Sequence, residues 1–533
     1  MSTPKKLIAL ALFALVACGD DAAPKKNVIL ITLDTTRADY LSCYGVHAGV
    51  TPNLDALAAQ GTRFDMAIST AGVTPVSHAS ILTGLNNQEH RLRGLSADGG
   101  FRLPDDVATL ATVLAKEGYK TVAVHSALPV SRHFGFQRGF EVFEDLNGEI
   151  TTNMRDDEKR ETWDVKTFQR RSDETTDLVE KSLGGDEPYF LWIHYWDPHD
   201  WSRMPPDEAM PPKELWWDAA KEQPVRPGLE LYKAELRYED AQIGRLFEWL
   251  KSKGLLENTI VVVTADHGQG LMEHEWAAHR LLYQEQVHVP LIIDVPGAQQ
   301  AAAVKDLVRT IDIYPTILDL VGVQPPKPVS GRSLRALIDG KPDEKRIAFA
   351  DQINGYDTNA GMTGKRPFDH FLYMAIDWPW KLIYRPLSPD KSLLYDLAKD
   401  PDEANNLYAS EHEVRVRLLR ELAKARPWVV GEFEPAAGAQ SADVKTGMNE
   451  LGYTAGQTFD PTWIWICPEH LEQQVESATS RCSLCKGPPI MVVDPACIWV
   501  CGRHADQTLS GPDGVCPVEG CDAEPKIVKP GKK

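Results

Sequence analysis

The sequence predicts an α/β fold in which a mostly parallel sheet is sandwiched by helices and followed by a small C-terminal α+β subdomain. Five apolar runs of strand length recur along residues 27–297, and amphipathic helical patterns lie between them. Uninterrupted apolar strands suit a parallel sheet covered on both faces, and alternation with helices is typical of α/β proteins. Seven of the nine cysteines follow Pro461, which predicts a separate, small Cys-rich metal-binding tail.

The five strands are expected at residues 27–34, 120–125, 189–199, 259–268 and 289–297. Helical patterns cover residues 103–119 and 238–255, and Gly118 and Gly254 lie where their last turns end. From about Arg346 the pattern changes to an antiparallel hairpin over residues 380–396, which indicates the smaller subdomain. Residues 432–447 have the composition of a surface linker.

Polar side chains follow the apolar strands at the points where these end. The strand ends carry Asp34, His125, His199, Asp266 and His267. In an open α/β sheet the ligand crevice lies beyond the carboxyl ends of the strands. These side chains therefore predict a functional site at that edge. Two carboxylates and an imidazole, Asp34, Asp266 and His267, suit one divalent cation, Mn²⁺, Zn²⁺, Mg²⁺ or Ca²⁺.

Thr74 opens the segment VTPVSHASILTG, residues 73–84, where a loop runs into a helical pattern. One interpretation is a helix cap, because threonine often accepts hydrogen bonds from the first backbone N–H groups of a helix. The other is a nucleophile, since coordination to a metal would activate the hydroxyl. The helix dipole would then favour an anionic substrate, which points to displacement at phosphorus or sulfur.

The net charge and the N-terminal sequence limit the possible partners and the expected location of the protein. The net charge of −19 argues against a nucleic-acid partner. At the N-terminus, Lys5 and Lys6 precede an apolar run over residues 7–17, too short to span a bilayer and typical of a signal peptide. The run ends in LVAC, so Cys18 resembles the lipidated cysteine of a bacterial lipoprotein lipobox; the alternative is a plain signal peptide. We expect a bacterial cell-envelope lipoprotein, on the periplasmic side or the cell surface.

Several phrases together resemble the sulfatase family of the alkaline phosphatase superfamily. They occur in the family's order over residues 27–456, and they include NVILITLDTTRADYLSCYG, TPNLDALAAQGTRF, TPVSHASILTG, LWIHYWDPH, TADHG, VHVPLII, DIYPTILDLVG, GRSL and LYDLAKDPDEANNL. The resemblance implies an alkaline-phosphatase-like fold and ester hydrolysis at a metal-bound anion. It makes Asp34, Thr74, Asp266 and His267 the implied metal ligands, with Thr74 as nucleophile.

Several positions depart from the family pattern. A sulfatase proper carries a cysteine that is oxidised to formylglycine where this chain has Thr74, and threonine cannot undergo that oxidation. Superfamily members with threonine at this position act on phosphate diesters, which favours a phosphoester over a sulfate ester. Thr35 replaces a second aspartate, which weakens the case for calcium and favours manganese or zinc. His125 and Ser126 stand where a substrate-binding lysine is expected.

Histidines supply the remaining residues implied by the resemblance. His199 corresponds to a histidine that contacts the ester or protonates the leaving group. His279 corresponds to a substrate or second-metal histidine. His78, His125 and His194 are further candidates for the substrate pocket, although structural roles suit each of them as well.

The tail contains a repeated pattern, C-x2-H-x11-C-x2/4-C. Its first unit has Cys467, His470, Cys482 and Cys485, and its second has Cys501, His504, Cys516 and Cys521. Three thiolates and an imidazole per unit suit tetrahedral Zn²⁺, so two zinc ions are expected. The first unit also resembles the heavy-metal-binding module of bacterial efflux proteins. Disulfides are the alternative in an exported protein.

The sequence as a whole predicts five segments: a signal peptide (1–18), a tether (19–26), a sulfatase-like catalytic domain (27–345), its C-terminal subdomain (346–456) and a tandem Cys3His module (457–533). The predicted function is metal-dependent hydrolysis or transfer of a phosphate or sulfate ester, phosphoester favoured. Its substrate would be an anionic small molecule, glycan or lipid headgroup, and a lipid anchor would hold the protein at the membrane. The alternative is a catalytically silent scaffold that binds metal or a partner.

Overall fold

A computed structural model of the chain describes its fold. The described residues are 25–94, 102–146, 169–184, 188–200, 210–215, 217–218, 223–224, 228–298, 303–354, 366, 368–425, 463–469, 474–475, 481–485, 490–493, 498–501, 508–509 and 525–528. Among them, no helix has both the length and the apolar character needed to cross a membrane.

The centre of the molecule is a nine-stranded sheet with the order β11-β2-β10-β8-β1-β5-β3-β4, and β9 pairs with β2. Its strands are β1 (Asn27–Leu33), β2 (Thr62–Ile68), β3 (Lys120–His125), β4 (Val142–Glu144), β5 (Tyr189–Tyr195), β8 (Thr259–Ala265), β9 (His288–Val289), β10 (Leu291–Asp294) and β11 (Val304–Arg309). The strands β8, β1, β5, β3 and β4 run parallel to one another. The predicted mostly parallel α/β sheet is confirmed.

Strand β10 corrects one part of the prediction, because it runs antiparallel to both β8 and β2. Its residues are as apolar as those of the parallel strands, since Leu291, Ile292 and Ile293 are buried on both faces. Strand direction in a fully buried strand leaves no mark on hydropathy, so the pattern alone could not reveal it.

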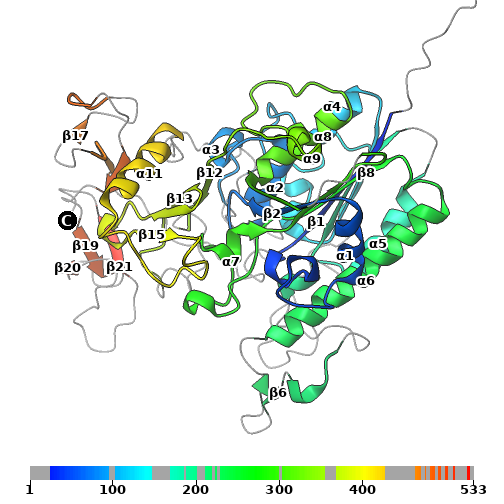
Figure 1. Cartoon of the computed structure of the whole chain (residues 1–533), viewed down its shortest axis with the longest axis horizontal. Coiled ribbons are helices and arrows are strands. Elements are labelled where there is room, and N and C mark those ends of the chain that lie inside the picture. The colour runs from blue at the N-terminus through cyan, green and yellow to red at the C-terminus, as the bar shows by residue number, and fades with distance from the viewer. Residues whose placement is uncertain are drawn as a thin grey trace, which may run out of the picture.

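Helices cover both faces of this sheet (Figure 1). On one face lie α1 (Pro52–Gln60), α5 (Ser172–Ser182) and α6 (Leu229–Ser252), and on the other lie α2 (Thr74–Thr83), α4 (Leu110–Lys116), α8 (Ile313–Leu320) and α9 (Arg335–Ile338). Shorter elements are α3 (Asn87–His90), α7 (Gln284–Val287), the pair β6 (Trp217–Asp218) and β7 (Gln223–Pro224), and 3-10 turns at Ala38–Tyr40, Ser42–Tyr44, Leu128–Val130, Arg132–Phe134, Asp197–Asp200, Lys213–Leu215, Glu273–Glu275, Thr310–Asp312 and Pro389–Lys391.

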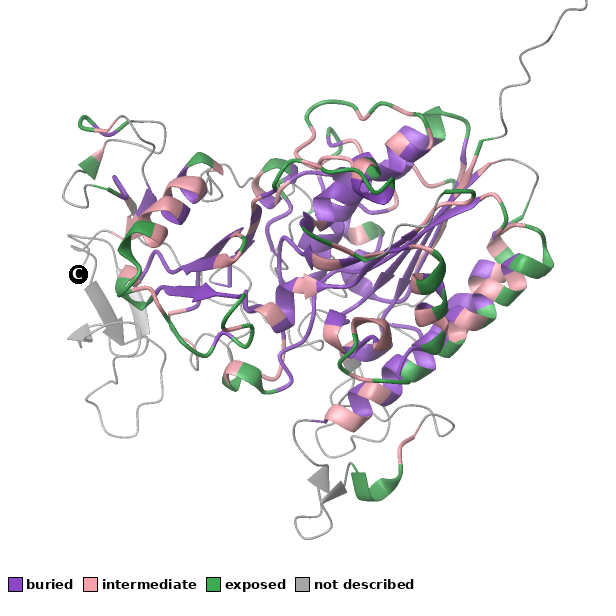
Figure 2. Ribbon diagram, in the orientation of Figure 1, coloured by how far each residue is buried: buried purple, intermediate pink, exposed green. Residues whose placement is uncertain are grey.

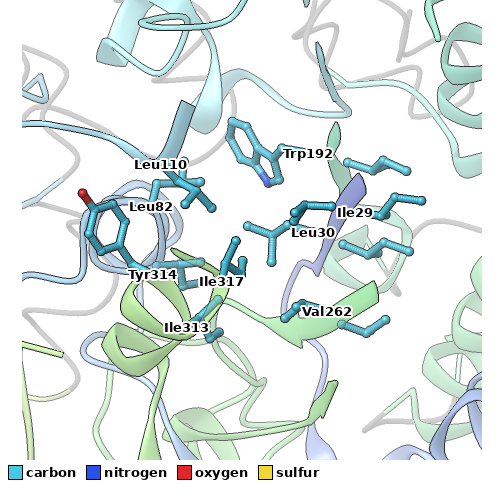
Figure 3. Packing of buried hydrophobic residues seen from close by; sticks show 14 of the residues in the cluster. Ile29, Leu30, Leu82, Leu110, Trp192, Val262, Ile313, Tyr314 and Ile317 are labelled. Carbon is cyan, nitrogen blue, oxygen red and sulfur yellow. The ribbon is translucent and has the colours of Figure 1, made fainter. Parts of the chain in front are cut away.

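The main hydrophobic core fills the space between sheet and helices. Leu30 pairs in register with Trp192 on one side and Val262 on the other. These strand residues and the helix residues Leu82 and Ile317 belong to one buried cluster and lie together in Figure 3. Figure 2 shows the buried residues concentrated in the sheet and on the helix faces that cover it. The core thereby fixes where the carboxyl ends of β1 and β8 lie.

The C-terminal subdomain is a four-stranded antiparallel sheet covered by α11 (His412–Ala425). Its strands, in the order β12-β13-β14-β15, are β12 (Ala348–Gln352), β13 (Leu372–Asp377), β14 (Trp380–Tyr384) and β15 (Leu393–Asp396). The predicted hairpin is formed by β14 and β15.

The tail contains two small antiparallel sheets of the same topology. The first has the order β17-β16-β18, with β16 (Trp463–Ile466), β17 (Gln474–Val475) and β18 (Ile490–Val493), and the second has the order β20-β19-β21, with β19 (Ile498–Cys501), β20 (Thr508–Leu509) and β21 (Pro525–Val528). Trp465 pairs with Val475 and Met491, and Trp499 pairs with Leu509 and Ile527. The sequence duplication is therefore also a duplication of fold.

Candidate active site

Three predicted metal ligands meet at the carboxyl edge of the central sheet. Asp34 directly follows β1, and Asp266 and His267 directly follow its parallel neighbour β8. One ligand atom from each of the three side chains lies within 4.8 Å of the others, and all three residues are fully buried. The parallel pairing of two adjacent strands is what brings together residues more than two hundred positions apart.

The two carboxyl groups fit a cation. Burial, together with the neighbouring negative charge of Asp266, raises the pKa of Asp34, and burial also raises the pKa of Asp266. Asp34 Oδ1 and Asp266 Oδ2 are buried oxygens without a hydrogen-bond partner among the described residues. Buried polar atoms are normally satisfied, so these oxygens are suited to bind a positive ion between them.

The orientation of His267 also fits a metal ligand. Its Nδ1 donates a hydrogen bond of 2.9 Å to the carbonyl oxygen of Gly268. That bond leaves Nε2 with the lone pair, and Nε2 lies 3.3 Å from Asp266 Oδ2. Burial lowers the pKa of His267 to about 3, which keeps the imidazole neutral. A neutral imidazole oriented by a hydrogen bond at its other nitrogen is the form that binds metals.

Thr74 is the first residue of α2, and it is fully buried. Its hydroxyl oxygen lies 3.4 Å from His267 Nε2. Val73, not Thr74, occupies the N-cap position, and α2 has no side-chain capping hydrogen bond. The capping interpretation of Thr74 is therefore wrong. The hydroxyl instead lies among the candidate ligands, at the positive end of a ten-residue helix.

His194 and His78 support this site through protein contacts. His194 Nδ1 accepts a hydrogen bond from the backbone N–H of Ser126, and its Nε2 donates one of 3.2 Å to Asp34 Oδ2. His78 Nδ1 donates to the carbonyl oxygen of Thr74 at 2.8 Å, and its Nε2 lies 3.0 Å from the Thr32 hydroxyl. Both ring nitrogens of each histidine thus contact protein atoms, which favours positioning roles over substrate contact.

His199 and His279 lie beside His267 in a cluster of imidazole rings. The ring centroids of His279 and His267 are 4.5 Å apart, and those of His199 and His279 are 5.5 Å apart. His199 was expected at the end of β5, but that strand ends at Tyr195 and His199 lies in the following 3-10 turn, Asp197–Asp200. Its ring stacks on that of Trp196. The His279 ring is fixed by a 2.8 Å hydrogen bond from Nδ1 to the carbonyl oxygen of Gly72.

Arg280 is a buried cation beside this cluster that sequence inspection did not single out. Burial lowers the pKa of both His267 and His279, and the positive charge of Arg280 contributes to the shift at each. A fixed positive charge next to neutral histidines suits an anionic substrate. In the sequence, the only sign of this role is that a charged residue directly follows His279 and precedes two leucines.

Of the two positions that depart from the family pattern here, His125 lies in a structural hydrogen-bond network, whereas Thr35 contacts a candidate metal ligand. His125 Nε2 contacts Asp145 at 2.8 Å and its Nδ1 contacts the carbonyl oxygen of Ala127 at 3.0 Å, which favours a structural role. Thr35 adopts a positive φ of 49°, unusual for a β-branched residue, and its backbone N–H donates to Asp266 Oδ1 at 3.1 Å. The residue that replaces the second aspartate therefore orients the carboxylate of another candidate ligand.

The predicted tail ligands are described only in part. Cys467, Cys482 and Cys485 lie together, with their sulfur atoms within 4.8 Å of one another. His470, His504, Cys516, Cys521 and the lipobox residue Cys18 lie outside the described residues, and of Cys501 only the backbone at the end of β19 is described.

The comparisons with known proteins agree with this fold. The Sulfatase family model matches residues 26–323, and a model for the C-terminal part of N-sulphoglucosamine sulphohydrolase matches residues 272–427. The chain is 25% identical to an N-acetylglucosamine-6-O-sulfatase of Bacteroides thetaiotaomicron, covering 78% of this chain and 90% of that one. It is also 25% identical to an arylsulfatase of Clostridium perfringens, covering 75% and 93%.

A similar fold occurs in the crystal structure of a phosphonate monoester hydrolase of Agrobacterium radiobacter, with a TM-score of 0.58 and 21% identity over 75% of this chain and 95% of that one. The matched family model spans more than half of the 533 residues and includes every residue of the site described above. The chain therefore belongs to the sulfatase family of the alkaline phosphatase superfamily and is an ester hydrolase of that family.

Proposed function

We propose that the protein cleaves an anionic ester by attack of the Thr74 hydroxyl on the central phosphorus or sulfur atom, and that a phosphoester is the preferred substrate. The observation that carries this proposal is the place of Thr74, buried at the start of α2 and 3.4 Å from His267 Nε2. A threonine at this position cannot be converted to formylglycine, which leaves its unmodified hydroxyl as the nucleophile in this proposal.

The surrounding residues have distinct roles in this proposal. Asp34, Asp266 and His267 would hold one divalent cation, which supplies Lewis-acid chemistry at the substrate oxygens when bound. The α2 N-terminus and Arg280 add positive charge for the substrate anion. Thr74 Oγ1 forms the new bond as the bond to the leaving oxygen breaks, and the hydroxyl proton passes to solvent. His199 donates a proton to the leaving oxygen, and water then cleaves the threonine ester.

The substrate preference is tested by a panel of aryl phosphate monoesters and diesters, a phosphonate ester and an aryl sulfate, each assayed with Mn²⁺, Zn²⁺, Mg²⁺ and Ca²⁺. We expect the highest kcat/KM for a phosphoester or phosphonate ester with Mn²⁺ or Zn²⁺. The similar proteins include sulfatases and a phosphonate monoester hydrolase, so the panel contains the ester types that their names give. Turnover of the aryl sulfate alone would reverse the preference.

We also propose that the protein is exported and anchored through Cys18. The support is the sequence of residues 1–18, in which two lysines precede an apolar run that ends in LVAC. Expression of the wild type and of Cys18→Ser in a bacterial host, with a radiolabelled fatty acid, tests this. Label and membrane association should depend on Cys18, and equal labelling of both proteins would refute the anchor.

A further inference from the structure

The first tail unit forms a compact thiol cluster far along the chain from the active site. Cys467 directly follows β16, and Cys482 and Cys485 flank a turn between β17 and β18. All three sulfur atoms lie within 4.8 Å of one another, and Cys467 Sγ is 3.5 Å from Cys485 Sγ. Cys467 and Cys482 are buried. The end of β16 and the turn at residues 481–485 therefore direct three sulfur atoms to one point.

The sulfur spacing matches a metal site better than a disulfide. A disulfide requires about 2.05 Å between sulfur atoms, and three thiols cannot all be paired with one another. Two thiolates on a tetrahedral zinc ion, each bound at about 2.3 Å, lie roughly 3.8 Å apart. None of these three cysteines is joined in a disulfide in the described part of the chain.

The turn also directs backbone N–H groups at one of the sulfur atoms. The backbone N–H groups of Cys485 and Leu484 donate hydrogen bonds to the sulfur of Cys482. Cys43, in the catalytic domain, is likewise outside any disulfide among the described residues and is not part of this cluster.

The tail sheet that carries the cluster packs against the C-terminal subdomain. Ile490 and Met491 of β18 are buried in the same hydrophobic cluster as Leu418 and Leu422 of α11. The Tyr384 hydroxyl donates a 2.7 Å hydrogen bond to the carbonyl oxygen of Met491. A metal that ties the turn 481–485 to the end of β16 would therefore hold this docked sheet in shape.

We propose that Cys467, Cys482 and Cys485 bind one Zn²⁺ ion, which holds the first tail sheet in the shape that packs on the C-terminal subdomain and takes no part in ester cleavage. Three thiolates favour zinc over the hard cations Mg²⁺ and Ca²⁺, which prefer oxygen ligands. The fourth position is left to water or a further donor. This proposal is independent of the proposed nucleophile and substrate, because no cysteine lies among the residues of the ester site.

Cobalt is a selective probe of such a site, since thiolate ligands give Co²⁺ an intense ligand-to-metal charge-transfer band that carboxylate and imidazole ligands do not. Full-length protein, kept reduced and stripped with a chelator, should develop this band on addition of Co²⁺ and lose it on addition of Zn²⁺. Cys485→Ser should lower the band relative to the wild type. The matched control Cys43→Ser should not change it. No band in the wild type, or an equal band in Cys485→Ser, would overturn the proposal.

Alkylation of the wild type keeps the test decisive if the variant does not fold. Iodoacetamide labelling mapped by peptide mass spectrometry should be at least tenfold slower at Cys482 and Cys485 with Zn²⁺ than with a chelator, while labelling of Cys43 should not depend on zinc. Zinc-independent labelling of Cys482 and Cys485, or recovery of Cys467 in a disulfide from protein isolated without reductant, would show that the thiols do not hold this metal.

Discussion

His194 Nε2 donates a 3.2 Å hydrogen bond to Asp34 Oδ2, and the backbone N–H of Ser126 holds the opposite ring nitrogen of His194. This arrangement fixes both the tautomer and the orientation of the histidine. The hydrogen bond to Oδ2 leaves Oδ1, which has no partner among the described residues, as the oxygen for a cation. Hydrogen-bond partners of metal-ligating side chains typically tune metal affinity by 10–100-fold.

His194→Ala should therefore weaken binding of the active-site metal by about 10–100-fold. The effect should appear as a raised metal concentration for half-maximal activity, with kcat largely recovered at saturating metal. His133→Ala, in the 3-10 turn Arg132–Phe134, is the control and should leave the metal titration unchanged. An unchanged titration in His194→Ala would show that its bond to Asp34 has no influence on the metal.

Thr74→Ala should abolish turnover and change stability little. Thr74 does not cap α2, so the free energy of unfolding in the presence of a chelator should fall by less than the roughly 1 kcal/mol of a lost cap. Thr74→Ser, which keeps the hydroxyl, should retain measurable activity. Steady-state assays and urea unfolding measure both quantities. Substantial activity in Thr74→Ala would mean that water, not the threonine, attacks the substrate.

The effect of Asp34→Asn on the free energy of unfolding should change sign when metal is added. Without metal, the substitution removes repulsion between two buried carboxyl groups, so the variant should be at least as stable as the wild type. At a Mn²⁺ concentration of 100 times Kd, the wild type should gain about 2.7 kcal/mol, and the variant should gain much less. Urea unfolding with a chelator and with Mn²⁺ tests this. A wild type that no divalent cation stabilises would refute the metal site.

The carboxyl edge of the sheet could be predicted because parallel strands deliver their last residues to one place. Asp34, Asp266 and His267 follow β1 and β8 directly, and the structure brings them together. His199 was misplaced because the apolar run continues past Tyr195 into a turn, where Trp196 is buried by stacking and not by strand pairing. An apolar residue that is buried by tertiary packing extends the apolar run, so the hydropathy pattern does not show where the strand ends.

Residues outside the motifs were harder to predict. Arg280 enters the site through a loop with positive φ, and loop conformation has no periodicity to detect. The docking of the tail on α11 was missed for a related reason: Ile490 and Met491 form a short apolar run that is uninformative until its partner surface is known. Long-range packing of short segments leaves too little local pattern for a prediction.

Asp145 should contribute stability that acid removes. Burial would raise the pKa of this carboxyl, but hydrogen bonds from His125 and Arg132 outweigh burial and lower it to about 2. A depressed folded-state pKa stabilises the protein above the unfolded value of about 3.9, and this contribution is lost as the pH falls toward 2. Asp145→Asn should therefore cost about 2 kcal/mol at pH 7 and about half as much at pH 3.

Urea unfolding at the two pH values measures this contribution of Asp145. Asp106→Asn is the matched control, because Asp106 is an exposed acid paired with Arg91 at the surface. Exposed pairs contribute at most about 1 kcal/mol, so the control should show a smaller cost at both pH values. A cost for Asp145→Asn that is the same at pH 3 as at pH 7 would contradict the assigned shift.

Truncation of the tail should have two distinct effects, depending on where the chain is cut. A chain ending at residue 496 keeps β18 on α11, whereas a chain ending at residue 460 removes Ile490 and Met491 from the buried cluster that they share with Leu418. Burial of two such side chains contributes about 3 kcal/mol or more, so only the shorter chain should lose this much free energy of unfolding.

Both truncated chains should hydrolyse the preferred ester at temperatures where they are folded, because every residue of the ester site precedes residue 323. Thermal and urea unfolding, with activity measured on the same samples, test this. Equal stability of the two truncated chains would show that the first tail sheet does not dock on α11 in solution.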